Sequence, residues 1–103
     1  MFEAVLTRNI HREGSERIST YLAHGGYQAV QLALDKSPQE IIEMIKKSGL
    51  RGRGGAGFPA GLKWDAMPKG TEHPKIVAVN TDAGEPRTFK DREIVEQDPH
   101  QVI

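Results

Sequence analysis

The chain is organised around residues 51–61, which read RGRGGAGFPAG and run directly into Leu62-Lys63-Trp64. This segment holds five of the eleven glycines in the chain. Glycine at this density costs backbone entropy, and it suits a segment that takes positive φ or passes very close to another group. Arg51, Arg53 and Lys63 place positive charge around the bare amides. We therefore interpret the segment as a loop that cradles a flat, anionic ligand, with a nucleotide as the ligand class.

Three known glycine motifs match this loop only in part. Gly52-x-Gly54-x-x-Gly57 has the spacing of the dinucleotide fingerprint, but that fingerprint follows a strand and opens a helix. Here we expect a helix before the glycines and a strand after them. A P-loop requires Gly-Lys-Ser/Thr, which Gly61-Leu62-Lys63-Trp64 does not supply. The glycine-rich loop of protein kinases lies between two strands and does not fit either.

Two other interpretations give the loop no nucleotide. An RG-rich segment can bind RNA by stacking arginines on bases, but RGRGG occurs once and the net charge of the chain is +0. A flexible linker between domains is the structural alternative, and the residues leave it open. Linkers rarely contain Phe58, Pro59, Leu62 and Trp64 so close together, which favours the ligand loop.

A helix is expected immediately before the loop. Ser37-Pro38-Gln39-Glu40 combines a capping serine, a proline at the first helical position and a glutamate at the third. Lys46 and Lys47 suit the negative end of the helix dipole, and Gly49 is a natural stop. The residues expected to face the core are Ile41, Ile42, Ile45 and Met44.

The other elements are predicted from shorter signals. Residues 1–26 are expected to be irregular, since apolar positions are sparse and glycines interrupt them, and Tyr27–Leu34 is expected to be a short helix. Lys75–Asn80, KIVAVN, predicts a buried strand. Lys90–Gln97 predicts one or two helical turns. Asp98-Pro99-His100-Gln101 repeats the capping pattern. A helix of about one turn does not stabilise itself, so we expect the chain to be a piece of a longer one.

Length and composition limit the possible functions. A chain of 103 residues makes at most one domain. The balanced charge gives no general attraction to nucleic acid or to an anionic membrane. We expect neither a membrane span nor a secretory signal. With no cysteine, the chain has no disulfide and no thiolate ligand for zinc or an iron–sulfur cluster. Surface or loop positions are expected for His11, His24, His73 and His100.

A second polar stretch, residues 80–92 (NTDAGEPRTFKDR), starts where the predicted strand ends. Ligands of open α/β sheets bind beyond the carboxyl ends of strands. Asn80 and Asp82 can form hydrogen bonds with the edge of a heterocycle, and Glu85 can accept hydrogen bonds from ribose hydroxyls. The alternative, an acidic turn followed by a solvated helix, would be preferred if this stretch stood alone.

Together the two stretches resemble one family. SGLRGRGGAGFPAGLKW, VNTDAGEPRTFKDR and the DPH helix start are similar to the flavin- and NADH-binding subunit of respiratory NADH:quinone oxidoreductase (complex I) and to its relatives in NAD-linked hydrogenases and formate dehydrogenases. The segments LTRNIH and HGGYQAV extend the resemblance over nearly the whole chain. Family members continue for several hundred residues, which supply the rest of the flavin site and a cysteine cluster for a [4Fe–4S] centre. This chain holds no ligand for that centre.

The resemblance implies a function and a fold. NADH would transfer a hydride to FMN, and the electrons would pass singly to iron–sulfur clusters and quinone. The fold would be α/β: residues 1–36 would form an N-terminal arm with a short helix, and residues 37–103 the incomplete first part of a Rossmann-like FMN/NADH-binding domain. Without the rest of the subunit, the chain is expected to be inactive. The alternative is a non-catalytic nucleotide-binding or interaction module derived from that subunit.

By resemblance, Gly52, Arg53, Gly54 and Gly55 would lie against the flavin and the nucleotide. Phe58 would pack on the adenine end of NADH, Lys63 would offset negative charge, and Trp64 would belong to the core. Asn80 and Asp82 would bind FMN, and Glu85 would hold NADH. The full set expected to bind NAD(H) or FMN is Gly52, Arg53, Gly54, Gly55, Ala56, Gly57, Phe58, Pro59, Ala60, Gly61, Lys63, Asn80, Asp82 and Glu85.

The expected partners are NADH and the iron–sulfur subunits of a respiratory or NAD-linked oxidoreductase complex, with no nucleic acid. The expected location is the cytoplasm, peripheral to the inner membrane through that complex, or the matrix side of a mitochondrion. Three positions depart from the family pattern: Ala83 where glutamate is usual, Ala66 where a second aromatic is frequent, and Arg87 where glycine is common. We expect these departures to weaken NADH binding and to alter the flavin potential.

Overall fold

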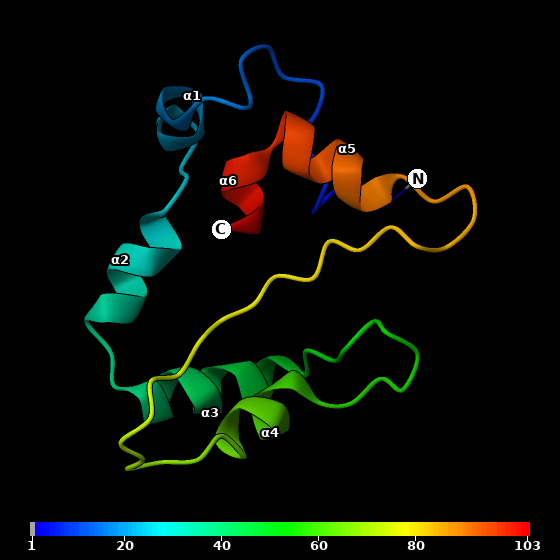
Figure 1. The fold of residues 1–103 in the computed structure, drawn as a ribbon. Helices are drawn as coiled ribbons and strands as arrows, with labels where there is room; N and C mark the ends of the chain where they lie inside the picture. Colours follow the sequence, from blue (N-terminus) through cyan, green and yellow to red (C-terminus); the bar gives the residue numbers. More distant parts are fainter. Residues whose placement is uncertain (1) are drawn as a thin grey trace. The chain divides into compact units, whose positions relative to one another are not determined.

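The structure is a computed structural model, and it describes residues 2–103. It is helical, with short helices joined by loops (Figure 1). Across the described residues no strand forms, and the β-type pairing is limited to one isolated antiparallel bridge between Arg51 and Pro59. The helices are α1 (Ile18–Ala23), α2 (Gln28–Leu34), α3 (Pro38–Ser48), α4 (Ala60–Asp65), α5 (Lys90–Gln97) and α6 (Pro99–Val102).

The chain divides into two compact units. The terminal unit consists of Met1–Gln28 and Ile76–Ile103, and the central unit is Ala29–Lys75. The predicted domain boundary between residues 36 and 37 stays a prediction, because compact units of a structure need not coincide with the domains of a protein family. The predicted helices are present, but residues 2–103 contain no sheet from which the predicted Rossmann-like α/β start could be recognised.

In the central unit, α3 forms as its capping pattern predicts. The Glu40 amide donates to Ser37 Oγ over 3.2 Å, and the Ser37 amide donates to Glu40 Oε2 over 2.7 Å. Pro38 opens the helix, and Gly49 ends it with a left-handed φ of 70°. The hydrogen bond from the Ser37 amide lowers the pKa of the Glu40 carboxyl, and that from the Ser37 side chain lowers it further. The predicted capping box and helix stop are confirmed.

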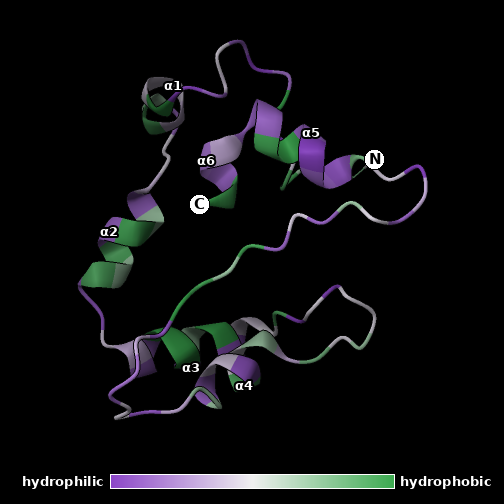
Figure 2. Cartoon of the chain, in the orientation of Figure 1, coloured by the Kyte–Doolittle hydropathy of each residue, from purple (hydrophilic) through white to green (hydrophobic). Residues whose placement is uncertain are grey.

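The apolar stripe of α3 is less covered than predicted. Ile41, Ile42 and Ile45 are half-buried, and Met44 is exposed. Figure 2 shows apolar residues on α2, α3 and α5 as green bands beside purple polar ones. Trp64, expected in the core, keeps 49% of its surface exposed, and no apolar side chain is buried anywhere in residues 2–103. Tryptophan is large and is rarely buried completely, and the packing around the six-residue helix α4 leaves about half of this side chain open to solvent.

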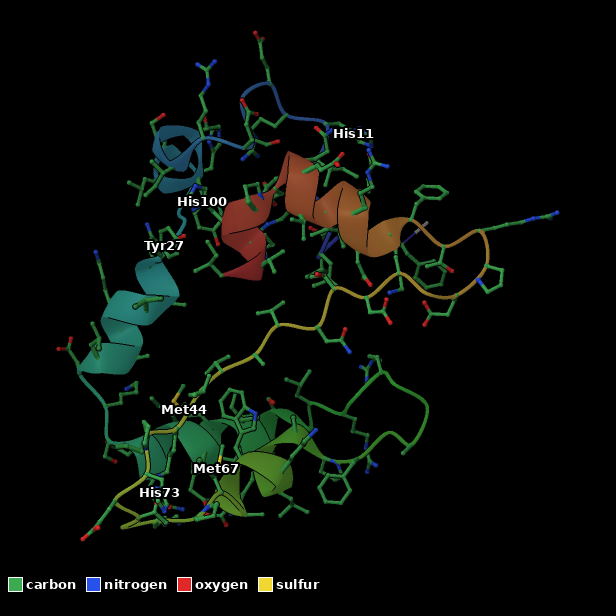
Figure 3. All side chains as sticks on the ribbon, viewed as in Figure 1. His11, Tyr27, Met44, Met67, His73 and His100 are labelled. Atoms are coloured by element: carbon green, nitrogen blue, oxygen red, sulfur yellow. The ribbon has the colours of Figure 1, made fainter. Side chains whose placement is uncertain are left out.

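Polar and aromatic contacts hold the terminal unit together. Tyr27 Oη and His100 Nδ1 lie 2.7 Å apart (Figure 3). The Tyr21 ring stacks on the His100 ring with centroids 5.7 Å apart. The fully buried Asp98 accepts a 2.9 Å hydrogen bond from Asn9 Nδ2. The Ser15 hydroxyl donates to the Gln97 carbonyl. These contacts link α1 and the turn before it to α5 and α6.

Three predictions for this unit need correction. Residues 1–26 are not irregular throughout, because Ile18, Tyr21 and Leu22 have helical spacing and α1 forms there. The Asp98 side chain does not cap α6, since its carboxylate is turned to Asn9 instead. His100 is neither in a loop nor on the open surface: it is a half-buried helical residue, whereas His11, His24 and His73 are exposed as expected.

The predicted strand at Lys75–Asn80 is also wrong. These residues are not part of any strand, and Ile76 and Val77 are 82% and 92% exposed. A β-branched run forms a strand only when a neighbouring strand satisfies its backbone groups, and residues 2–103 provide none. The helices predicted at Tyr27–Leu34 and Lys90–Gln97 are confirmed as α2 and α5. None of the helices described is long and apolar enough to cross a bilayer.

Candidate functional site

The glycine loop, residues 50–60, is a closed loop between α3 and α4. At its base the Gly52 amide donates to the Phe58 carbonyl over 2.9 Å, and the Ala60 amide donates to the Leu50 carbonyl over 2.8 Å. These two bonds make the antiparallel bridge between Arg51 and Pro59. Gly55 and Gly57 take φ values of 114° and 62°, which favour glycine strongly. The glycines therefore let the chain reverse within the loop.

The tip of the loop presents unused hydrogen-bond donors. Within residues 2–103 the amides from Arg53 to Phe58 have no acceptor. A Cβ built on Gly54, Gly55 or Gly57 would meet no atom within 4 Å, so open space adjoins the backbone there. Consecutive free amides in a glycine-rich turn form a concave surface with positive partial charge, which is a common way to bind anions.

The two arginines of the loop form hydrogen bonds with its backbone carbonyl groups. Arg51 Nη1 donates to the Gly57 carbonyl over 3.1 Å, and Arg53 Nη1 donates to the Arg51 carbonyl over 2.8 Å. Both guanidinium groups thus satisfy carbonyl oxygens of the loop, and the amides remain for a ligand. Phe58 is 55% exposed, and Lys63 is an exposed residue of α4 directly after the loop.

Gly61 differs from the glycines of the tip. It is buried, and a Cβ there would lie 2.6 Å from Lys46 Cγ and 2.7 Å from Lys46 N. No real Cβ approaches a backbone nitrogen so closely, so glycine is required for α4 to lie on α3. This packing role holds whether or not a ligand is bound.

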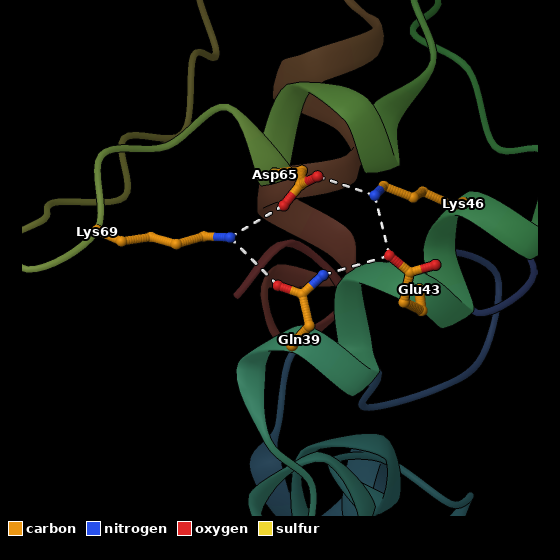
Figure 4. A network of polar contacts seen from close by, with 5 residues as sticks. All are labelled: Gln39, Glu43, Lys46, Asp65 and Lys69. Atoms are coloured by element: carbon orange, nitrogen blue, oxygen red, sulfur yellow. Dashed lines mark hydrogen bonds and ion pairs between the residues drawn. The ribbon is translucent and has the colours of Figure 1, made fainter.

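An ionic network joins the two helices that carry the loop (Figure 4). Lys46 Nζ lies 2.9 Å from both Asp65 Oδ2 and Glu43 Oε1. Lys69 Nζ lies 3.1 Å from Asp65 Oδ1 and 3.2 Å from Gln39 Oε1. The hydrogen bond from Lys46 lowers the pKa of the Asp65 carboxyl, and the bond from Lys69 adds to this. The hydrogen bonds with Asp65 and then Glu43 raise the pKa of Lys46.

Sequence reasoning missed this network. The pairing of Asp65 with Lys69 carries a signal, since the two lie four residues apart along the chain. Lys46 and Asp65 are nineteen residues apart, and nothing in their local sequence indicates that they meet. Lys46 was expected only to suit the end of α3. Its main contact crosses to α4 instead.

The second predicted stretch belongs to the terminal unit. Asn80 Oδ1 accepts a 2.9 Å hydrogen bond from the Asp82 amide, which makes a small polar turn. Further on, the Thr88 amide donates to the Glu85 carbonyl over 3.1 Å and closes a second turn. Arg87 occupies its third position with φ of 63°, the sign that a type II turn requires and that glycine adopts without strain.

The structure brings together the predicted residues from Gly52 to Gly61 with Lys63, all in the central unit. Asn80, Asp82 and Glu85 lie together in the terminal unit. Their joint participation in one site remains a prediction. Residues 2–103 contain no cluster of three or more histidine, aspartate or glutamate side chains suited to a metal ion.

Residues 45–103, which include the glycine loop and the stretch from Asn80 to Arg92, match the family described as the Nuo51 FMN-binding domain. The chain belongs to this family. It is 55% identical over 104 residues to the second F subunit of the NADH-quinone oxidoreductase of Rhizobium meliloti (strain 1021), covering 100% of this chain and 25% of the relative. The corresponding NADH-quinone oxidoreductase protein of Aquifex aeolicus (strain VF5) is 54% identical over 86 residues, which is 84% of this chain and 20% of the relative.

A third relative, the F subunit of the NADH-quinone oxidoreductase of Rickettsia massiliae (strain Mtu5), is 45% identical over 95 residues. That alignment covers 92% of this chain and 23% of the relative. The chain thus spans about a quarter of the length of these Nuo51 relatives. The predicted resemblance to the complex I subunit is confirmed. The Nuo51 match begins within α3, at residue 45. It therefore includes the whole glycine loop and the contacts of Lys46 with Gly61 and Asp65 on α4.

Proposed function

We propose that this chain forms the first part of the FMN- and NADH-binding site of an NADH dehydrogenase subunit. The glycine loop is the observation that carries the proposal. Its amides from Arg53 to Phe58 have no acceptor in the described part of the chain, and the loop lies inside the family match. Free amides bind phosphate, and the absence of Cβ atoms lets a flat ring approach the backbone. FMN offers both a ring and a phosphate, so the residues present fit it.

Each part of the loop has a role in this proposal. Gly52, Gly54 and Gly55 give the flavin access to the backbone, and Arg53 holds the loop with its guanidinium. The exposed Phe58 ring packs on the adenine of NADH. Lys63 offsets the negative charge of the nucleotide. The loop residues that complete this surface are Ala56, Gly57, Pro59 and Ala60. Gly61, also expected from the resemblance to bind the nucleotide, is buried against Lys46 and supports the loop through packing.

The polar turn at residues 80–85, in the terminal unit, is proposed to contribute hydrogen-bonding groups for the two nucleotides. Asn80 uses its side-chain oxygen for the Asp82 amide, which leaves its NH₂ group for a heterocycle. The Asp82 carboxylate can accept hydrogen bonds from ring N–H groups of FMN. Glu85 can accept them from the ribose hydroxyls of NADH.

In the proposed reaction these residues only bind FMN and NADH and orient their rings. Held by the loop, FMN would supply the acceptor for a hydride from NADH and would allow the electrons to leave one at a time to an iron–sulfur cluster. Hydride transfer requires the two rings to be stacked in contact, and the loop fixes the position of one of them. It requires no nucleophile and no general base in the protein, which agrees with the residue types in the loop.

The departures at Ala83, Ala66 and Arg87 modify the proposed site. Ala83 removes a carboxylate beside the proposed flavin position, so the flavin potential should differ from that of relatives that carry glutamate there. Ala66, at the end of α4, offers no ring to sandwich adenine against Phe58. Both changes should weaken NADH binding. In a full-length subunit, Ala83→Glu should restore affinity and shift the potential. An unchanged potential and an unchanged affinity would contradict this reading.

In the complete protein, the partners would be the iron–sulfur subunits of a respiratory complex. The chain would lie in its peripheral arm, on the cytoplasmic side of the inner membrane or in a mitochondrial matrix. These assignments rest on what the relatives are named and on the family match.

FMN titration of the 103-residue chain tests the proposal, with Gly54→Ala as the decisive variant. A Cβ at Gly54 meets nothing within 4 Å, so the variant should fold unchanged by far-UV circular dichroism. It should nevertheless weaken FMN binding about tenfold, because the methyl group occupies the space of the ring. Flavin fluorescence gives the dissociation constant. Equal affinity of the two proteins, or no saturable binding by the wild-type chain, would contradict the proposed loop site.

The alternative is a nucleotide-binding module without redox activity, which the coverage of about a quarter of the relatives favours for this chain alone. The two are distinguished in a full-length subunit that carries this sequence, by adding NADH to the FMN-loaded protein without oxygen. Bleaching of flavin absorbance indicates the dehydrogenase half-reaction. Stable oxidised flavin indicates the module.

A further inference from the structure

The width of the glycine loop is set by the two helices that flank it. α3 ends at Ser48 and α4 begins at Ala60, so the loop spans the gap between one helix end and one helix start. The bond from the Ala60 amide to the Leu50 carbonyl, 2.8 Å, closes that gap. Any shift of α4 along α3 would therefore change the spacing of the free amides.

Two contacts prevent such a shift. Gly61, one residue inside α4, lies so close to Lys46 that even a methyl group would overlap its backbone nitrogen, at 2.7 Å. Lys46 then reaches across to Asp65 near the other end of α4, at 2.9 Å. The same lysine thus contacts α4 twice, through its backbone at the start and through its ammonium group at the end.

The Lys46–Asp65 pair is more sheltered than the other ion pairs of the described chain. Its side chains are 25% and 32% exposed, whereas both members of the Arg92–Glu96 pair on α5 exceed 50%, at 76% and 53%. Partial shelter reduces screening by water and salt, so such a pair holds its geometry better than an exposed one. Lys69 binds the second oxygen of Asp65 over 3.1 Å and fixes the carboxylate further.

We propose that Lys46, Gly61 and Asp65 form a clamp that presets the glycine loop for its nucleotide. We call it the α3–α4 clamp, and its members are positioning residues that do not touch the ligand. A loop already held in its binding geometry loses less conformational entropy on binding, which raises affinity. The identity of the nucleotide, FMN, rests on the proposed function above; the presetting of the loop does not.

Asp65→Asn distinguishes positioning from simple charge. Asp65 is an anion, so removing it makes the surroundings of an anionic nucleotide more positive. Coulomb's law alone then predicts tighter FMN binding. The clamp predicts the opposite, because the neutral amide no longer holds Lys46 and Lys69 in place. The two explanations therefore predict opposite changes in FMN affinity, so the direction of the change is enough to decide between them.

The experiment uses the full 103-residue chain with FMN as the probe. The variants are Asp65→Asn, Lys46→Met, their double mutant and Glu96→Gln, a control that removes an anion from the 2.8 Å pair on α5. FMN affinity is measured by fluorescence, and amide order parameters of Gly54, Gly55 and Gly57 by nitrogen-15 relaxation without ligand. Intact Ser37–Glu40 cap signals show that α3 is still folded.

We expect Asp65→Asn to weaken FMN binding at least about threefold and to lower the loop order parameters, while Glu96→Gln changes neither. The free-energy loss in the double mutant should be smaller than the sum of the losses in the two single mutants, because both lose the Lys46–Asp65 pair, while each also loses a separate contact with Glu43 or Lys69. Unchanged loop order, or tighter binding by Asp65→Asn, would overturn the clamp. If the wild-type chain does not bind FMN, the proposed function fails, and the order parameters alone then support or overturn the clamp.

Discussion

At the scale of single residues, two side chains occupy backbone conformations that favour glycine. Tyr27 has φ of 61° and Arg87 has φ of 63°. A residue with a Cβ is strained in this region by roughly 1–2 kcal/mol. Tyr27 offsets that cost through its contact with His100 at 2.7 Å and its edge-on packing against Tyr21. Arg87 makes no ion pair or side-chain hydrogen bond within residues 2–103, so nothing described offsets its strain.

Arg87→Gly is therefore expected to stabilise the turn from Glu85 to Thr88. The gain should be about 0.5–1 kcal/mol, after the larger backbone entropy of glycine is subtracted. Hydrogen exchange at the Thr88 amide measures it, since that amide closes the turn. Arg87→Ala is the matched control, because it removes the charge but keeps the Cβ. Equally fast exchange in both variants would show that strain at this residue is negligible.

At the scale of elements, the sequence predicted correctly those features that form through interactions between residues close together in the chain. The Ser37 cap, the Gly49 stop and the bounds of α5 come from hydrogen bonds between residues near in sequence. The contact of Lys46 with Asp65 and the turning of Asp98 to Asn9 depend on residues far apart, which one sequence does not indicate. The prediction of a strand at Lys75–Asn80 was wrong for a related reason: β-branched residues are present, but residues 2–103 contain no strand with which they could pair.

The stability of the packing between α3 and α4 should decrease both in strong acid and in strong base. The pKa of Asp65 lies below its ordinary value of 3.8, so its stabilising contribution is present above that pH and is lost as the pH falls through the lowered value. Glu43, which also faces Lys46, has a lowered pKa and acts in the same direction. The pKa of Lys46 lies above 10.5, so its contribution is present below that pH and is lost at higher pH.

Amide chemical shifts of α4 followed against pH measure this dependence. We expect native shifts between the two limits, a change in strong acid and another in strong base. Asp65→Asn should reduce the acid change, leaving the smaller part that belongs to Glu43, and high salt should reduce both changes. An acid change of the same size in Asp65→Asn would assign it to other carboxyls, such as Glu40 at the start of α3.

At the scale of the whole molecule, the absence of buried apolar side chains in residues 2–103 decides how the chain unfolds. Cooperative unfolding and its denaturant dependence come from the surface that folding buries. Here the contacts are caps, ion pairs and the aromatic group around His100, each of which can open by itself. We expect a broad urea transition with an m-value below about 1 kcal/mol/M, the lower end for small proteins.

Two probes test this expectation in one titration. Tyrosine fluorescence reports the terminal unit through Tyr21 and Tyr27, and tryptophan fluorescence reports the central unit through Trp64. Because no apolar side chain is buried in residues 2–103, the two transitions should have different midpoints. Saturating FMN should raise the tryptophan midpoint, because a ligand that binds only the folded loop stabilises the unit that carries it. Coincident, steep transitions would instead require a common apolar core, and would contradict a molecule held together by local polar contacts.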